Sequence, residues 1–142
     1  MATEHAIDLA TALTDGMTAH DLSSWAAALA DDFVAEYPGA PSLDAAQARA
    51  FNQAFVDAFP DLRFTVHRVI VDGDLAVVHW TGGGTHTAPL ATLSGQIIPP
   101  TGRAGSVTGV FLVETRNGRI VAERSYWDQM GLLAQLGLLP GA

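Results

Sequence analysis

The chain has 142 residues, of which 49% are hydrophobic and 15% charged, and its net charge is −8. This length predicts one domain, here residues 1–142, with enough apolar surface for a packed core. The acidic balance argues against binding to nucleic acid, which requires a basic face, and against docking on an anionic membrane. The sequence contains no cysteine, which excludes disulfides, thiol catalysis and cysteine-bound zinc.

No targeting or membrane-spanning segment is recognisable in the sequence. The first residues, Met1 to His5, lack the basic start and the apolar run of a signal peptide. No apolar stretch approaches the ~20 residues that a helix needs to cross a bilayer. We therefore expect a cytoplasmic protein.

The N-terminal part has the apolar spacing of helices. Ile7, Leu13 and Met17 fall on one helical face. Asp21 is the expected N-cap of a second, short helix that carries Trp25. These residues predict two helices before the first proline.

A loop and a third helix follow. Residues 37–41 contain two prolines and a glycine, which predict a loop that begins with Tyr37. Ser42 or Asp44 is the expected cap of the next helix, since Phe51, Phe55 and Phe59 then recur every four residues. Pro60 is expected to end this helix.

The period of the pattern changes to two after residue 62, which is typical of strands. Residues 64–71 and 75–81 are rich in β-branched and aromatic side chains and flank a hairpin turn at residues 72–74. The glycine run 82–84 is expected to interrupt or bend the second strand. Residues 88–105 are expected to form a long loop, with a short strand around residues 96–98.

A second hairpin and a short helix complete the pattern. Residues 107–115 and 119–128 are expected to pair around Asn117-Gly118, a type I′ turn signature. A helix is expected over residues 129–136, with Gly137 just after its end. Helices followed by strands predict an α+β fold, in which about three helices and a curved antiparallel sheet form a cone around an apolar pocket.

The register of the second hairpin assigns its side chains to faces. If Asn117-Gly118 is a two-residue turn, Arg116 lies opposite Arg119 and Phe111 lies opposite Arg124. The inner face is then apolar, and Phe111 belongs to it. Its polar members are the following residues near the end of the last strand: Arg124, Tyr126 and Asp128.

Asp128 has two interpretations. At the end of an apolar wall, burial raises the pKa of a carboxyl group, which then exchanges protons near neutral pH. An aspartate between a strand and a helix is also a common N-cap. Arg124, about 13 Å away at ~3.3 Å per residue, is a candidate to hold an anionic group of a substrate.

Five segments together resemble a known family. In chain order they are Gly83-Gly84-Thr85-His86-Thr87, Ile98-Pro99-Pro100-Thr101-Gly102-Arg103, Asn117-Gly118-Arg119-Ile120-Val121, Tyr126-Trp127-Asp128-Gln129-Met130-Gly131-Leu132-Leu133 and Gln135-Leu136-Gly137. This series resembles the SnoaL-like polyketide cyclases, or ester cyclases, of the NTF2-like superfamily. The likeness covers nearly the whole chain, and its most specific part is the segment 126–137.

The resemblance implies a cone with a deep pocket, a homodimer or higher homo-oligomer, and a hydrophobic small-molecule substrate. Cyclases of this family close a ring by intramolecular aldol condensation without cofactor or metal. Their catalytic aspartate matches Asp128, which would be the general acid/base. Trp80 is expected inside the pocket by the same analogy.

Three further positions are expected near the substrate. His86 follows the glycine run and is a candidate proton relay or substrate contact at the pocket mouth, or a loop histidine that binds backbone. Phe111 is expected to line the pocket, and Tyr37 is expected either to line it or to pack in the core or at the rim. No metal-ligand motif such as HxH or HExxH is present.

Other activities on the same scaffold stay open. The strand 107–115 lacks the histidine that cyclases of this family often carry there. Relatives of the same shape hydroxylate, isomerise or open epoxides, and a non-catalytic binding module is a further alternative, because fold alone does not determine function.

Overall fold

The computed structural model describes residues 2–139, with side chains from residue 5 onward. The described residues form five helices. Their bounds are α1 Ala2–Ala10, α2 Ala12–Ala19, α3 Ser23–Ala27, α4 Ala45–Ala58 and α5 Gln129–Gln135.

Five strands form one mixed sheet in the order β1-β7-β6-β3-β2. Their bounds are β1 Leu29–Glu36, β2 Arg63–Asp72, β3 Leu75–Thr85, β6 Ala104–Arg116 and β7 Arg119–Trp127. All neighbours pair antiparallel except β1 and β7, which run parallel. A separate two-stranded arm pairs β4 Leu90–Ala91 with β5 Ile97–Ile98.

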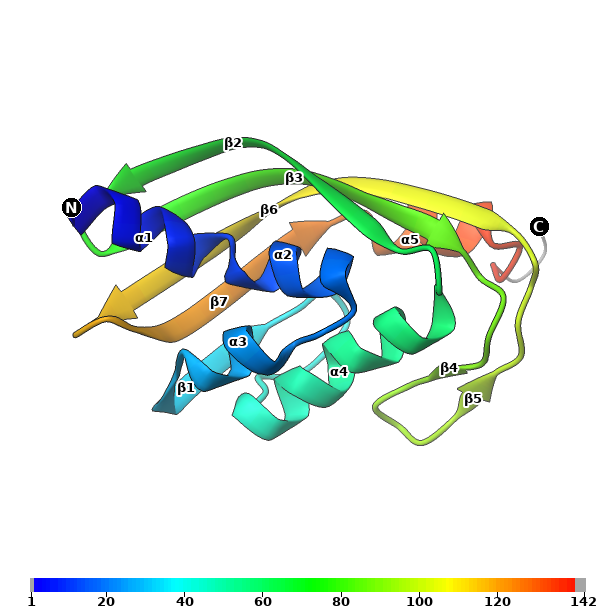
Figure 1. Cartoon of the computed structure of the whole chain (residues 1–142). Helices are drawn as coiled ribbons and strands as arrows, with labels where there is room; N and C mark the ends of the chain where they lie inside the picture. Colours follow the sequence, from blue (N-terminus) through cyan, green and yellow to red (C-terminus); the bar gives the residue numbers. More distant parts are fainter. Residues whose placement is uncertain (1, 140–142) are drawn as a thin grey trace.

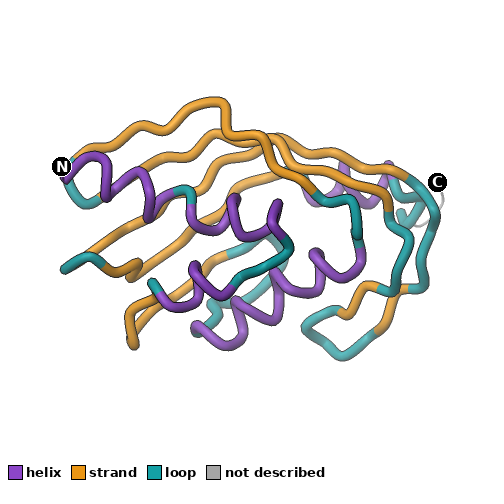
Figure 2. The backbone as a smooth tube through the Cα atoms, in the orientation of Figure 1, coloured by secondary structure: helices purple, strands orange, loops and turns teal. Residues whose placement is uncertain are grey.

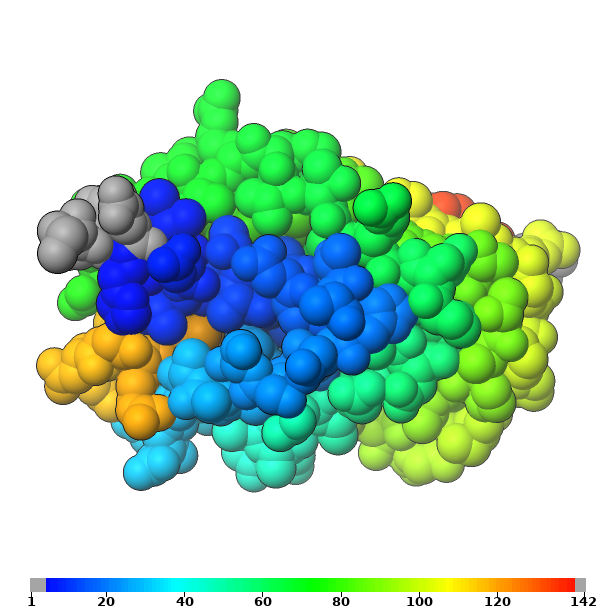
Figure 3. Space-filling model, in the orientation of Figure 1, coloured from blue at the N-terminus to red at the C-terminus, as the bar shows by residue number. Residues whose placement is uncertain are grey.

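The long strands curve over a layer of helices. In Figures 1 and 2, α1 to α4 lie on one side of the sheet, α5 lies at one end of it, and the β4–β5 arm extends beyond α4. Figure 3 shows the helical layer from outside. The expected α+β fold, with helices against a curved sheet, is confirmed; the sheet stays open, with β1 and β2 at its edges.

The helix boundaries follow from the predicted caps. The Asp44 carboxylate accepts a hydrogen bond from the Gln47 backbone N–H, and the Gln47 side chain binds the Asp44 N–H in return. This capping box starts α4, which ends at Ala58 with Phe59 as its C-cap, before Pro60. Asp21 accepts hydrogen bonds from the N–H and hydroxyl of Ser23, although Leu22 is the N-cap residue of α3.

Three sequence-based predictions about strands are wrong. Residues 29–36 form the edge strand β1, where no strand was expected, because β1 pairs with β7 from far along the chain. Of the two expectations for the glycines 82–84, a bend or an interruption, the interruption is wrong, since β3 continues through them and β6 pairs with them residue by residue. For the same reason β6 begins at Ala104, inside the expected loop.

A β-bulge changes the faces of the last strand. The turn is as predicted: Arg116 lies opposite Arg119, and Asn117 and Gly118 have positive φ angles of 54° and 75°. The register then shifts, so that Thr115 pairs with Ile120 but Glu114 pairs with Ala122. The extra residue exchanges the two faces of the strand from there on.

The bulge corrects the predicted inner face. Phe111 lies opposite Ser125 instead of Arg124. Glu123, Ser125 and Trp127 therefore share the inner face with Phe111, whereas Arg124 and Tyr126 lie on the outer face.

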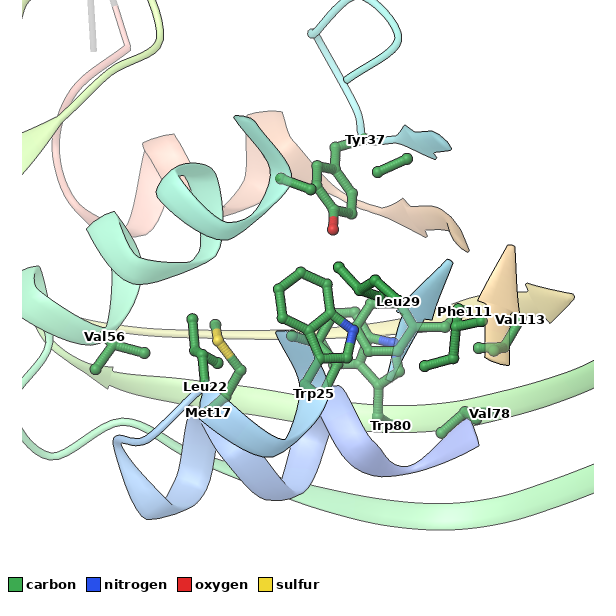
Figure 4. Packing of buried hydrophobic residues seen from close by; sticks show 14 of the residues in the cluster. Met17, Leu22, Trp25, Leu29, Tyr37, Val56, Val78, Trp80, Phe111 and Val113 are labelled. Atoms are coloured by element: carbon green, nitrogen blue, oxygen red, sulfur yellow. The ribbon is translucent and has the colours of Figure 1, made fainter. Parts of the chain in front are cut away.

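The core fills the space between the helices and the sheet. Trp25, Leu13 and Ile120 are almost completely buried, and Figure 4 shows Met17, Leu22 and Trp25 together near the inner strands. Each fully buried large apolar side chain contributes about 1.5–3 kcal/mol. Within residues 2–139, no helix has the length and apolarity needed to cross a membrane.

Candidate active site

A cavity opens between α4 and the inner face of the sheet. The space inside it that water molecules can occupy is about 70 Å³, and the wider space between its atoms, which includes the opening to solvent, is about 580 Å³. Met17 of α2 and Leu132 of α5 contribute to its walls, together with Leu62 before β2. The helices therefore enclose a site that the strands alone would leave open.

Eight aromatic side chains line the cavity. They come from the segment after β1, from α4 and from four strands: Tyr37, Phe51, Phe55, Phe59, Phe64, Trp80, Phe111 and Trp127. Several rings stack or meet edge to face, as Tyr37 does with Phe51 at 4.6 Å between centroids. The stripe that defined α4 in the sequence thus supplies one side of the cavity. Such a wall favours a flat apolar ligand.

Gly109 makes room for two of these side chains. A Cβ atom at this position would lie 2.9 Å from the Trp80 ring and 2.8 Å from Cβ of Trp127. It would also lie 2.5 Å from the carbonyl oxygen of Tyr126, which is backbone and cannot move aside. The absence of a side chain therefore leaves room for the Trp80 ring and for the Cβ atom of Trp127 next to β6.

Three polar side chains line the cavity: Tyr37, Asn52 and Ser125. The Asn52 side-chain amide donates a hydrogen bond of 2.9 Å to the Tyr37 hydroxyl oxygen. The Tyr37 proton is left for another acceptor. The Ser125 hydroxyl is buried and has no partner among the described residues.

Glu123 shares the inner face of β7 with Ser125 and is fully buried, with 0% of its surface exposed. Its Oε1 accepts a hydrogen bond of 3.1 Å from the Trp25 indole N–H, and its Oε2 has no partner among the described residues. Figure 4 shows the Tyr37 hydroxyl directed toward Trp25. We call Tyr37, Asn52, Glu123 and Ser125 the polar end of the cavity.

Burial dominates the titration of this cluster. It raises the pKa of Glu123 to about 8, against the smaller lowering effect of the Trp25 hydrogen bond. It also raises the pKa of Tyr37, and charge on nearby Glu123 acts in the same direction. At neutral pH the polar end is therefore an uncharged set of hydroxyl, amide and carboxylic acid groups.

Asp128 does not line the cavity. It is exposed, and its Oδ1 accepts a hydrogen bond of 2.8 Å from the Gly131 N–H. The expectation that Asp128 lies at the end of the inner apolar wall is wrong, because the bulge exchanges the inner and outer faces of β7. Asp128 is the N-cap of α5, the structural alternative that the sequence left open.

Arg124 and Tyr126, which were expected in the pocket, also do not line the cavity. The Arg124 guanidinium donates to Glu36 at 3.1 Å and to Glu114 at 2.9 Å on the outer face. These carboxylates raise the pKa of Arg124. The side chain of Tyr126 is 55% exposed on the same face.

His86 is buried next to the cavity rather than at its mouth. Its ring stacks on Phe59 with 5.3 Å between centroids. Its Nδ1 accepts a hydrogen bond from the Thr101 N–H at 3.3 Å, and burial lowers the pKa of the imidazole. Together with backbone bonds to Gly102 and Arg103, these contacts tie the β4–β5 arm to α4.

The sequence expectations and the structure agree on three cavity residues. Tyr37, Trp80 and Phe111 line the cavity, as expected. Sequence reasoning missed Asn52, Glu123 and Ser125. Asn52 sits one position after Phe51 on an apolar helix face, which was a usable signal, whereas the bulge that turns Glu123 and Ser125 inward has no signature in the sequence.

The described residues contain no group of three or more histidine and acidic side chains that could hold a metal ion. The histidines are dispersed: His86 binds the arm, while His67 and His79 face each other with 5.1 Å between ring centroids. His67 binds the Thr81 hydroxyl at 2.7 Å.

Comparison with known families gives one match. A family profile described as SnoaL-like polyketide cyclase matches residues 7–136. No curated protein matches the chain.

Solved structures share the fold over almost the whole chain. A protein from Jannaschia sp. CCS1, provisionally described as a SnoaL-like polyketide cyclase, is 22% identical with a TM-score of 0.80, covering 96% of this chain and 94% of that one. IdmH from Streptomyces antibioticus, provisionally a polyketide cyclase, is 28% identical with a TM-score of 0.75, covering 93% and 98%. AclR from Streptomyces galilaeus, provisionally a hydroxylase, is 22% identical with a TM-score of 0.80, covering 98% and 85%.

The buried acid predicts a specific pH dependence of stability. The unfolded chain loses the Glu123 proton near its ordinary pKa of 4.5, whereas the folded protein keeps it to about 8. Between these values the free energy of unfolding falls as pH rises, by up to about 1.4 kcal/mol per pH unit, and it levels off above pH 8. Glu123→Gln should lack this contribution, which chemical denaturation at pH 5, 7 and 9 measures.

The matched control is Glu114→Gln on the outer face, which should keep the wild-type dependence. Parallel stability profiles for Glu123→Gln and the wild type would contradict the assignment.

Proposed function

Because the chain belongs to the SnoaL-like polyketide cyclase family, we propose that it is a cofactor-independent enzyme that closes a ring by an aldol-type reaction. The proposed substrate is a hydrophobic ester or ketone that becomes a flat, polyketide-like ring system. The observation that carries this proposal is the aromatic cavity with one polar end.

The cavity supports ring closure through proximity. Rings such as Phe55, Trp80 and Trp127 leave a confined apolar space in which a flexible chain must fold. Holding the two reacting carbons together removes much of the entropic barrier of the reaction. The aromatic wall also matches the flat product better than an extended chain.

The polar end supports the electronic part of the reaction. In an aldol closure, the carbon that has lost a proton forms a bond to the carbonyl carbon, and the C=O π electron pair moves to the oxygen. The proton that leaves the acidic carbon passes to solvent water, and the oxygen takes up one proton from a donor group of the site that solvent reprotonates, so that the closure moves one proton from carbon to oxygen overall. The hydroxyls of Tyr37 and Ser125 are placed to donate hydrogen bonds to such an oxygen in an apolar site, where they act most strongly.

Two carboxyl groups are candidates for the donor that protonates the carbonyl oxygen: Asp128 and Glu123. The family resemblance assigns the general acid/base role to Asp128, which is exposed and caps α5. Glu123 lies at the polar end and keeps its proton at neutral pH. We favour the polar end as the group that handles the carbonyl oxygen, and the role of Asp128 stays a prediction for the experiment below.

Hydroxylation on the same scaffold is the alternative, since AclR has this fold and is provisionally described as a hydroxylase. The two reactions differ in the origin of oxygen. Product formed under ¹⁸O₂ carries the label after hydroxylation and stays unlabelled after an aldol closure.

Substitutions of one serine inside the cavity and one serine outside it test the site. With a panel of aromatic poly-β-keto methyl esters, Ser125→Ala should lower kcat at least about tenfold, because one hydrogen bond to the developing oxyanion is lost. Ser106→Ala, which removes an exposed hydroxyl from β6, is the control and should keep wild-type turnover.

Asp128→Asn decides between the two carboxyl groups in the same assay. It should keep most of the turnover if the polar end performs the chemistry. If a folded Asp128→Asn protein loses turnover while Ser125→Ala keeps full activity, the proposal for the polar end is contradicted. Asp128 would then be the catalytic residue.

We also propose that the protein is a homodimer. The outer sheet face and its edges carry apolar side chains that are 38–55% exposed: Val34, Ile70, Leu75 and Tyr126. Sedimentation velocity should give twice the chain mass of 14.9 kDa, and Ile70→Glu should give the monomer. Leu93→Glu on the β4–β5 arm is the control, and a monomeric wild type would contradict the proposal.

A further inference from the structure

Two histidines meet on the outer face of the sheet, on the side away from the cavity. His67 of the edge strand β2 and His79 of its neighbour β3 face each other (the strands are seen in Figure 1). Their ring centroids are 5.1 Å apart, and the rings are tilted by 55° rather than stacked flat. Both side chains are exposed, so the pair is open to a ligand from solvent.

A β-bulge in β2 sets the position of His67. The register of β2 with β3 shifts between Val66 and Arg68, so that His67 is the extra residue. Val66 and Val69 both pack against the core, whereas His67 and Arg68 between them are exposed. Two consecutive side chains thus lie on the outer face, and bulges are often found where a side chain is redirected beside a functional site.

A chain of hydroxyl groups holds the His67 ring. Its Nε2 lies 2.7 Å from Oγ1 of Thr81, which in turn lies 2.8 Å from Oγ1 of Thr108 on β6. Histidines that bind metal ions almost always use their second ring nitrogen in such a bond, which fixes the tautomer and the orientation of the ring. Among the described residues, Nδ1 of His67 has no hydrogen-bond partner, and it is therefore the nitrogen available to a metal ion.

The separation of the rings fits two imidazoles on one ion. With Zn–N bonds of about 2.0–2.1 Å and a tetrahedral angle, the centroids of two bound imidazoles lie about 5 Å apart. Imidazole nitrogen suits Zn²⁺, Ni²⁺ and Cu²⁺, and the net charge of −8 attracts cations to the chain. The guanidinium of Arg68 is exposed on the same face, where solvent and salt weaken its repulsion of a cation.

We propose that His67 and His79 chelate a divalent transition-metal ion such as Zn²⁺ on the outer face of the sheet, with water in the remaining coordination positions. Both ligands come from one chain, so the site holds one ion per chain. Two protein ligands are fewer than the three or four of a catalytic or structural zinc, and the ion therefore exchanges with solvent. The cavity lies on the other face, and the ion takes no part in the reaction proposed above.

Isothermal titration calorimetry with ZnCl₂ tests this inference on a chain without a histidine tag. The wild type should bind one Zn²⁺ per chain in a saturable manner, and MgCl₂ should give no binding, because Mg²⁺ prefers oxygen ligands. His67→Gln and His79→Gln should each raise the Kd at least about tenfold, since one of the two ligands is lost. His5→Gln, which removes an exposed imidazole from α1, is the control and should keep the wild-type Kd.

Two further measurements report on the ligands themselves. Thr81→Val removes the hydroxyl that holds the His67 ring and leaves both ligands in place, so the Kd should rise about tenfold. In ¹H–¹³C NMR spectra, the imidazole Cε1–H resonances of His67 and His79 should shift on addition of Zn²⁺. The resonances of the other three histidines should stay unchanged.

The absence of saturable Zn²⁺ binding in the wild type, or an unchanged Kd in His67→Gln or His79→Gln, would overturn the inference. An unchanged Kd in Thr81→Val would overturn the role of the hydroxyl chain. None of these outcomes bears on the proposed function, because the inner and outer faces of the sheet are tested with different ligands.

Discussion

The candidate site depends on one extra residue in β7. The bulge after Ile120 places Glu123, Ser125 and Trp127 on the inner face and sends Arg124 to the outer one. A strand without the bulge would place an arginine and a tyrosine in the cavity and leave a glutamate outside. The polarity of the whole pocket thus follows from a local irregularity of pairing.

Other elements of the fold position the walls of the cavity opposite and beside the inner face of β7. The capping box at Asp44 fixes the start of α4, and so the direction of its phenylalanine stripe. Gly109 lets Trp80 and Trp127 lie close to β6, while His86 holds the β4–β5 arm near the end of α4. These contacts leave a chamber with aromatic walls and few polar atoms, in which each polar atom has a large effect.

Local patterns predicted the local structure well. Asp44, Pro60 and Asn117-Gly118 act through their immediate neighbours, so the sequence around them was sufficient. Pairing between distant segments was not predictable from local patterns. Residues 29–36 form β1 because they pair with β7, and β3 continues through three glycines because β6 pairs with them. The bulge belongs to this second class, and it places Glu123 and Ser125, rather than Arg124, on the inner face of β7.

Titration of the Glu123 side chain tests the central claim most directly. With glutamate labelled by ¹³C at the carboxyl carbon, NMR can follow this resonance against pH, and Glu123→Gln identifies it by its loss. A titration midpoint near 8 would agree with a carboxyl buried beside the cavity. A midpoint near 4.5 would mean that water reaches the group and that β7 presents its other face to the cavity.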